Sequence, residues 1–228
     1  VVKFKGPDRP KDVRHPEAFH AFRNGKPEAE SLLLETCRDP EAPAFTRAGA
    51  MLALRQFISK ASYDEARRNL DANDSVVRVA AISKLEDLSD DEAHRDLVPM
   101  LDDPNRTVRT EAARILARVP ETLFSPEDLE TFTQVFEELK LRYTSNLDRP
   151  ESHLSLGILA ENQNQPADAE KHYRKAVRRE STYVTARMNL ATLLSRRGRS
   201  KEAEEILREE MQLLDQLAVL HMTFLAFD

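Results

Sequence analysis

The chain has 228 residues, of which 40% are hydrophobic and 32% are charged, and its formal net charge is −6. This acidic balance does not favour binding to nucleic acid or to an anionic membrane surface, and no apolar run approaches the roughly 20 residues of a membrane span. The single cysteine, Cys37, permits no internal disulfide, and we expect it to be a small core residue of a helix and not a reactive thiol.

The first segment, residues 1–25, has few periodic apolar residues, and we predict an extended docking segment that a partner covers. It begins VVKFKGPDRP, without methionine, which is expected of a processed chain or a fragment. Two histidines of the segment are five residues apart, whereas two ligands on one helical face would be three or four apart. Packing is therefore favoured over ligation of a metal or a haem. The candidate docking residues are Phe4, His15, Phe19, His20 and Phe22.

Residues 26–119 contain one helical unit written three times. DSVVRVAAISKL is followed 31 residues later by the similar segment NRTVRTEAARIL. FTRAGAMLAL, whose arginine lies 31 residues before that of DSVVRVAAISKL, has the same pattern. In each copy an alanine lies three residues after an arginine and a leucine lies seven after it, a spacing that lines one side of a helix. A fixed step between similar segments is typical of a solenoid. We expect Ala50, Ala81 and Ala112 to be buried at equivalent positions between repeats.

The repeated arginines follow acidic turns, with Asp71 and Asp74 near the second and Asp102 and Asp103 near the third. They could form a ligand-binding row or a structural ladder in which arginine and carboxylate groups join successive turns, and this placement favours the ladder. The predicted ladder consists of Arg47, Arg78 and Arg109.

Residues 120–149 contain LETFTQVFEELKLRY, which has the apolar spacing of a long amphipathic helix. Ser125 is placed to cap this helix, and Pro126 to occupy its first turn. We expect the helix to join the repeats on either side of it rigidly.

Residues 150–228 show a second lattice with a step of 34, which pairs Leu156 with Leu190 and Ala169 with Ala203. Two helical hairpins follow, and then a tail that is a truncated third repeat or a capping helix. Basic runs such as YRKAVRRE and SRRGRSK are interleaved with glutamates, which favours a charge-balanced surface over an anion-binding strip. The predicted fold class is all-α, an α-α solenoid.

Catalytic sequence patterns are not found. The chain has no Gly-rich phosphate loop, no GxSxG and no C-x-x-C-H haem attachment sequence, and its six histidines are scattered. We therefore expect neither an enzyme nor a cofactor or metal held by this chain.

The copies around DDPNRTVRTEAARIL resemble short HEAT-like repeats, and LSLGILA, ADAEKHYRKAV, MNLATLL and EAEEILREEM resemble tetratricopeptide repeats. The proline that usually closes a tetratricopeptide repeat is replaced by Ser181 and Asp215. In that family the first helix of each hairpin lines a groove that binds protein segments. Only Asn189 matches the carboxylate clamp of chaperone-binding members, so capture of an acidic chain terminus is not expected. The groove residues that the resemblance implies are Leu154, Ile158, Glu161, Met188, Asn189, Thr192, Ser195 and Arg196.

The order of the repeats, with NLDRPESHLSLGILAENQNQPADAEKHYRKAV after them and RHPEAFHAFRNGKPEAES before them, resembles the C-terminal half of bacterial multihaem c-type cytochromes. The resemblance implies an exported protein, periplasmic or extracellular, in an electron-transfer assembly whose haem belongs to a partner or to a missing segment. The interpretation that we favour is a non-enzymatic scaffold with a protein partner, such as a c-type cytochrome, in a homo-oligomer or a larger assembly. A generic adaptor and a HEAT-like lyase are the alternatives.

Overall fold

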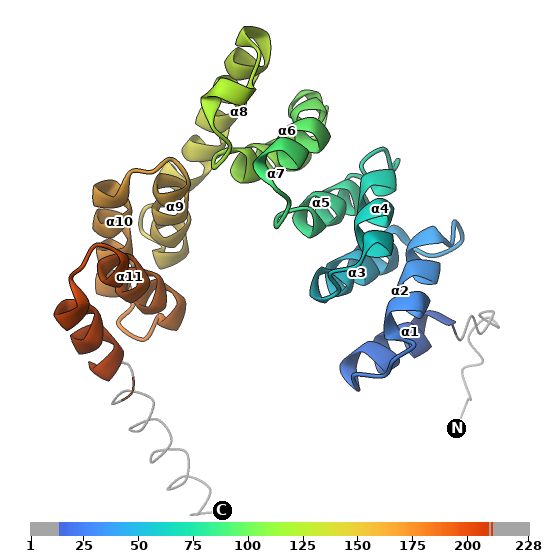
Figure 1. Ribbon diagram of the computed structural model, residues 1–228, viewed down its shortest axis with the longest axis horizontal. Coiled ribbons are helices and arrows are strands. Elements are labelled where there is room, and N and C mark those ends of the chain that lie inside the picture. The colour runs from blue at the N-terminus through green and yellow to red at the C-terminus, as the bar shows by residue number, and fades with distance from the viewer. Residues whose placement is uncertain (1–13, 210, 212–228) are drawn as a thin grey trace, which may run out of the picture. The chain divides into compact units, whose positions relative to one another are not determined.

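The computed structural model describes residues 14–209 and 211, and the regular structure within that part of the chain is helical, as predicted (Figure 1). The chain forms two compact units, Val1–Phe132 and Thr133–Asp228. The α-helices are α1 (Arg14–Arg23), α2 (Ala29–Arg38), α3 (Ala44–Ala53), α4 (Lys60–Asn69), α5 (Ser75–Lys84), α6 (Asp90–Leu97), α7 (Arg106–Leu116), α8 (Pro126–Thr144), α9 (Pro150–Asn162), α10 (Pro166–Arg179) and α11 (Val184–Arg196). The 3₁₀ turns are η1 (Leu54–Gln56), η2 (Val98–Asp102) and η3 (Glu121–Leu123), and residues 200–209 are also helical.

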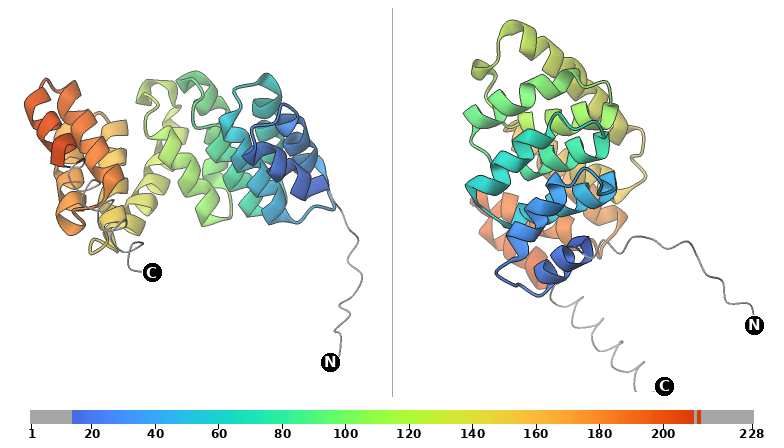
Figure 2. Two further views of the ribbon diagram at one scale, coloured as in Figure 1. Left: turned by 90° about the horizontal axis from the view of Figure 1, so that it is seen from below. Right: turned by 90° about the vertical axis from the view of Figure 1, so that its right-hand side faces the viewer.

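The first unit is a stack of antiparallel helical hairpins, α2 with α3, α4 with α5 and α6 with α7 (Figures 1 and 2). The second helices of the hairpins contact one another in the order α3, α5, α7, and α2 contacts α4. Each hairpin therefore buries its apolar side against the next one along the chain, which is how a repeat protein builds a continuous core.

The lattice of small residues lies where it was predicted. Ala50, Ala81 and Ala112 have no exposed surface, and the leucines four residues after each of them are equally buried. A methyl group at each position lets neighbouring helices approach closely, while the leucine fills the remaining space. Two of the turns end in polar caps, in which the Oγ of Ser59 accepts from the Ser62 amide and the Oδ1 of Asn105 accepts from the Thr107 amide.

The prediction of an extended segment over 1–25 is wrong for its second part, because residues 14–23 form α1, which packs on α2. The buried side of α1 is made by Ala18 and Ala21, three residues apart on one helical face. Alanines are too small to mark such a face in the sequence. Residues 1–13, with Phe4, lie outside the described part of the chain.

Helix α8 coincides with the long helix expected between the two lattices, and the predicted cap is present. The amide of Asp128 donates to Ser125 Oγ over 3.1 Å, and that hydroxyl donates in turn to the Asp128 carboxylate over 2.7 Å. The boundary between the two compact units falls within this helix. Rigid joining of the two lattices stays a prediction.

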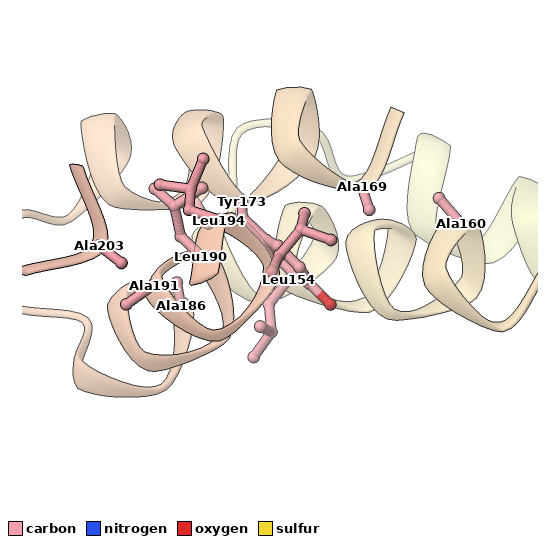
Figure 3. Close-up of a cluster of buried hydrophobic side chains, with 11 residues drawn as sticks. Leu154, Ala160, Ala169, Tyr173, Ala186, Leu190, Ala191, Leu194 and Ala203 are labelled. Carbon is pink, nitrogen blue, oxygen red and sulfur yellow. The ribbon is translucent and has the colours of Figure 1, made fainter. Parts of the chain in front are cut away.

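The second unit contains two hairpins, α9 with α10, and α11 with the helix at 200–209. Their turns are equivalent, since Asn164 and Gly198 both have positive φ, at 55° and 76°. Glycine and asparagine are the residues that accept this conformation most readily after a helix. Figure 3 shows the core that the hairpins share, with Tyr173 and Leu154 beside Leu190 of α11. The predicted third repeat or capping helix lies beyond the described residues.

Candidate protein-binding surfaces

Arg78 is the central member of the arginine ladder. Its Nε and Nη2 atoms donate to the two carboxylate oxygens of Asp103 over 2.7 and 2.9 Å, and Nη1 donates to the carbonyl of Ala72 over 2.7 Å. Both side chains are nearly buried, with 12% of Arg78 and 4% of Asp103 exposed. This fork ties the turn before α5 to the turn before α7, so the guanidinium is occupied within the stack and is not available to a ligand.

The other two arginines of the ladder have different partners. Arg47 approaches Asp74 only at 3.9 Å, and more than half of that carboxylate is exposed. Arg109 donates to the carbonyls of Asp103 and Pro104 in its own turn, over 3.3 and 3.2 Å. A fork to a carboxylate of the next turn is therefore seen at Arg78, whereas Arg109 binds carbonyls of its own turn and Arg47 has only the long contact with Asp74.

A second set of ion pairs, near the C-terminal ends of the second helices of the hairpins, was not predicted. Glu86 accepts from Arg55 of η1 and from Arg114 of α7, each over 2.7 Å, and Arg114 also binds Glu111. The sequence held a signal for the first of these pairs, since Arg55 and Glu86 are one repeat step of 31 residues apart. These charges are therefore neutralised within the stack.

The groove predicted on the tetratricopeptide hairpins is largely filled by its own side chains. Leu154 is buried in the core, with Ile158 packed against it. Glu161 accepts from the Tyr173 hydroxyl and from Arg196 Nη2, each over 2.5 Å. Four of the predicted residues, Arg196 among them, thus bind or pack within the unit, because α11 lies close enough to α9 for Arg196 to reach Glu161.

The remaining groove residues lie on α11. Met188 is 47% exposed, and Thr192 and Ser195 are exposed beside it. Asn189 is half-buried and its amide hydrogen-bonds Tyr173, whose pKa is raised by burial and by the Glu161 carboxylate. The apolar surface left for a partner in this groove is therefore small.

The basic runs of the second unit are neutralised only in part, whereas a charge-balanced surface was predicted. Glu170 accepts from Arg174, Arg197 and Arg199, and Glu202 accepts from Arg174 and Arg199. These pairs join α10 to the turn after α11 and to the helix at 200–209.

The candidate docking residues of α1 point in different directions. His15 Nε2 lies 3.1 Å from the Asp39 carboxylate and lines a cavity of about 390 Å³ against α2. His20 is exposed, 3.4 Å from the side-chain amide of Asn24. The two histidines therefore share no site.

Phe19 and Phe22 lie on another side of α1, where they line a groove of about 700 Å³ against α3. The Phe19 ring lies over Gly49, where an added Cβ would be 3.4 Å from it. Leu52, which is 48% exposed, forms the opposite wall. The groove, called the α1–α3 groove below, is lined by Pro16, Phe19, Phe22, Arg23, Gly49, Leu52, Ala53 and Gln56.

Cys37 is the free cysteine of the described residues, and it is buried. Burial raises the pKa of the Cys37 thiol to about 12, so the side chain is a neutral core residue, as predicted. Three side chains able to hold a metal ion do not come together anywhere in that range. Nor does any helix in it have the length and apolar character that crossing a membrane requires.

A histidine pair in the second unit was also missed. His153 of α9 is 3% exposed, and its Nδ1 lies 3.2 Å from Nδ1 of His172 on α10. Burial lowers the pKa of both side chains, as do the cations around them, among them Lys175. Since 3.2 Å is a hydrogen-bond distance, one ring nitrogen donates and the other accepts in the neutral pair.

We expect the second unit to lose stability as the pH falls below about 6.5, the usual value for an unfolded histidine. The pKa values of His153 and His172 are lowered in the folded chain, so the unfolded chain binds more protons there and unfolding is favoured at low pH. Urea midpoints of the wild type and of the His153→Leu/His172→Leu variant, at pH 7.5 and 5.5, test this. The variant should lose less stability between the two pH values, and an unchanged loss would contradict the assignment.

Comparison with known proteins agrees with the two kinds of repeat. Residues 66–140 match the model of HEAT repeats, and residues 162–209 match the model of the tetratricopeptide repeat. The first match begins in α4 and ends within α8, whereas the predicted HEAT-like region ended at 119. No curated protein and no solved structure matches the chain. The chain therefore carries HEAT repeats followed by tetratricopeptide repeats.

Proposed function

We propose that the chain is a non-enzymatic scaffold that binds a partner protein in the α1–α3 groove. The observation that carries the proposal is the pair of aromatic rings, Phe19 and Phe22, facing a half-exposed Leu52 across an open groove. Exposed apolar walls of this kind are typical of surfaces that another protein covers. Both kinds of repeat are commonly used for protein–protein interaction, which supports the same conclusion.

The surface of α3 suggests what the partner presents. Phe45, Gly49 and Leu52 follow the i, i+4, i+7 spacing of one helical face, and Phe45 is 73% exposed. The apolar face thus continues along α3 for about two turns, roughly 10 Å. A partner helix with apolar residues at the same spacing can cover it in the helix-in-groove mode.

The polar residues at the rim of the groove favour a partner with negative charge. Arg23 and Gln56 are its polar members, and an acidic side chain does not line it. Arg23 uses its Nε atom to donate to the carbonyl of Phe19, which leaves the guanidinium tip at the rim. We therefore propose an amphipathic helix with an acidic flank as the occupant.

The α1–α3 groove and the groove on α11 can be compared with matched variants. Leu52 and Met188 are exposed to nearly the same extent, 48% and 47%, one on each surface. Glutamate at either position adds the same charge to a helix surface. We expect Leu52→Glu to abolish capture of the partner from an extract of the source, and Met188→Glu to leave that capture unchanged. The captured protein is identified by mass spectrometry, and its affinity for each variant is measured by calorimetry.

The opposite order of effects would place the partner on α11, and equal affinities for both variants and the wild type would remove both grooves as the site. Self-association that Leu52→Glu abolishes, measured by analytical ultracentrifugation, would make a second copy of the chain the occupant. The helix mode is tested with a synthetic helical segment of the identified partner.

The finer part of the proposal is that the partner is a c-type cytochrome of an electron-transfer assembly in the periplasm or outside the cell. It is supported by the resemblance of the repeat order to multihaem cytochromes. Haem staining of the captured partner tests it: covalent haem is expected, and a haem-free partner would leave the scaffold function as that of a generic adaptor. A lyase activity, the remaining alternative, finds no support in the residues that line the groove.

A further inference from the structure

The second unit has a basic pocket of about 370 Å³ that the proposed scaffold function does not use. Lys175, Arg178 and Arg179 line it from the last turns of α10, where their i, i+3, i+4 spacing places them on one face of the helix. Leu147 and His153 complete the lining. The pocket lies wholly within the second unit, and an acidic side chain does not contribute to its lining.

The cations of this pocket differ from the other arginines of the unit. Arg174, Arg197 and Arg199 each bind a glutamate, whereas in residues 14–209 Lys175, Arg178 and Arg179 form no ion pair or hydrogen bond through their side chains. Three unpaired cations on one helical face repel one another. An anion between them would remove this repulsion.

His153 contributes to the pocket a polar wall that is held in place. It is 3% exposed, hydrogen-bonds the backbone of Leu147 and lies against His172. The three cations also lower its pKa, in addition to burial, which is the effect of a positive potential inside the pocket. The geometry and the potential therefore both favour an anionic ligand.

The position of the pocket at the end of α10 favours a carboxylate over a phosphate as the bound anion. The last turn of a helix presents carbonyl oxygens with partial negative charge, which repel a phosphate dianion more strongly than a single carboxylate. Nucleic acid binding needs a longer row of cations or an aromatic side chain on which bases stack, and neither is present in the lining. Leu147 adds an apolar contact at the side of the pocket.

We propose that this basic pocket binds an acidic segment of a protein, with one or two carboxylates between Lys175, Arg178 and Arg179 and a neighbouring apolar side chain on Leu147. Arginine is well suited to this task because its planar fork binds a carboxylate through two hydrogen bonds. The site is separate from the α1–α3 groove, so either proposal can fail alone.

The test measures binding of a fluorescein-labelled peptide, in which two glutamates alternate with leucines, to the full chain by fluorescence anisotropy at low salt. The variant Arg178→Gln/Arg179→Gln removes two cations of the pocket. The control, Lys201→Gln/Arg208→Gln, removes the same charge from exposed positions of the neighbouring helix. The first variant loses two partly exposed charge pairs with the peptide, so its affinity for the peptide is expected to fall about tenfold. The affinity of the control should fall less than about twofold.

Four results would overturn the proposal. They are no binding to the wild type, equal weakening in both variants, equally tight binding of the glutamine version of the peptide, and tighter binding of a phosphoserine peptide or a labelled oligonucleotide than of the glutamate peptide. Circular dichroism of each variant establishes that it is folded. The Leu52→Glu variant should bind this peptide as tightly as the wild type. A failure of the basic pocket can therefore be told apart from a failure of the α1–α3 groove.

Discussion

Replacement of Arg78 by methionine is expected to lower the free energy of unfolding by roughly 3 kcal/mol, a large part of the stability of a small repeat unit. The methionine keeps much of the length of the side chain but removes the guanidinium that binds both oxygens of Asp103. Since only 4% of the Asp103 side chain is exposed, its carboxylate would stay buried without its cation. Urea denaturation followed by circular dichroism gives the change.

Arg47→Met is the matched control for this prediction. Arg47 occupies the equivalent position one repeat earlier, but its nearest carboxylate, on Asp74, is 3.9 Å away and 57% exposed. An exposed pair contributes less than about 1 kcal/mol, so the control should cost little. Equal losses in the two variants would mean that the arginine acts through its aliphatic stem and not through the fork to Asp103.

Gly157→Ala is expected to destabilise the second unit by roughly 3 kcal/mol, although alanine is the better helix former by about 1 kcal/mol. A Cβ at this position would overlap Cε1 of the Tyr173 ring. Tyr173 is fully buried and its hydroxyl is held by Glu161, so the ring cannot move aside without breaking that bond. The thermal midpoint of the second unit measures the effect.

The second hairpin provides the control for this prediction, because it carries Ala191 and Leu207 where the first carries Gly157 and Tyr173. Tyr173→Leu alone should be destabilising, since it removes the bond to Glu161 and leaves a gap. In the Tyr173→Leu variant, Gly157→Ala should change the free energy of unfolding by about zero, because the ring that the new methyl group would meet is absent. If alanine costs the same with leucine as with tyrosine, the clash with the ring is not the cause.

Much of the fold could be predicted from the sequence because the same residue pattern, and with it the same contact between helices, occurs in several repeats. The step of 31 residues located Ala50, Ala81 and Ala112, and all three are fully buried. Helix α1 was missed because it occurs once and its buried side consists of alanines. The repeat pattern, which was traced through larger apolar residues, does not reveal a face made of alanines.

The candidate surfaces were harder to predict, because exposure depends on which side chains meet across helices. The family pattern named Glu161 and Arg196 as groove residues, but their mutual ion pair follows from how close α9 and α11 lie. Phe19 and Phe22 were expected to dock a partner from a loose segment. Their groove depends on how α1 packs against α3, where the Phe19 ring lies over Gly49, and a contact between helices so far apart in sequence has no signature in either helix alone.

Hydrogen–deuterium exchange of the chain with and without its captured partner tests the scaffold proposal most directly, because it reports where the partner lies without any mutation. The proposal predicts that binding slows amide exchange in α1 and α3, the two helices that form the α1–α3 groove, and leaves α11 unchanged. Protection confined to α9 and α11, or no protection in the first unit, would contradict it.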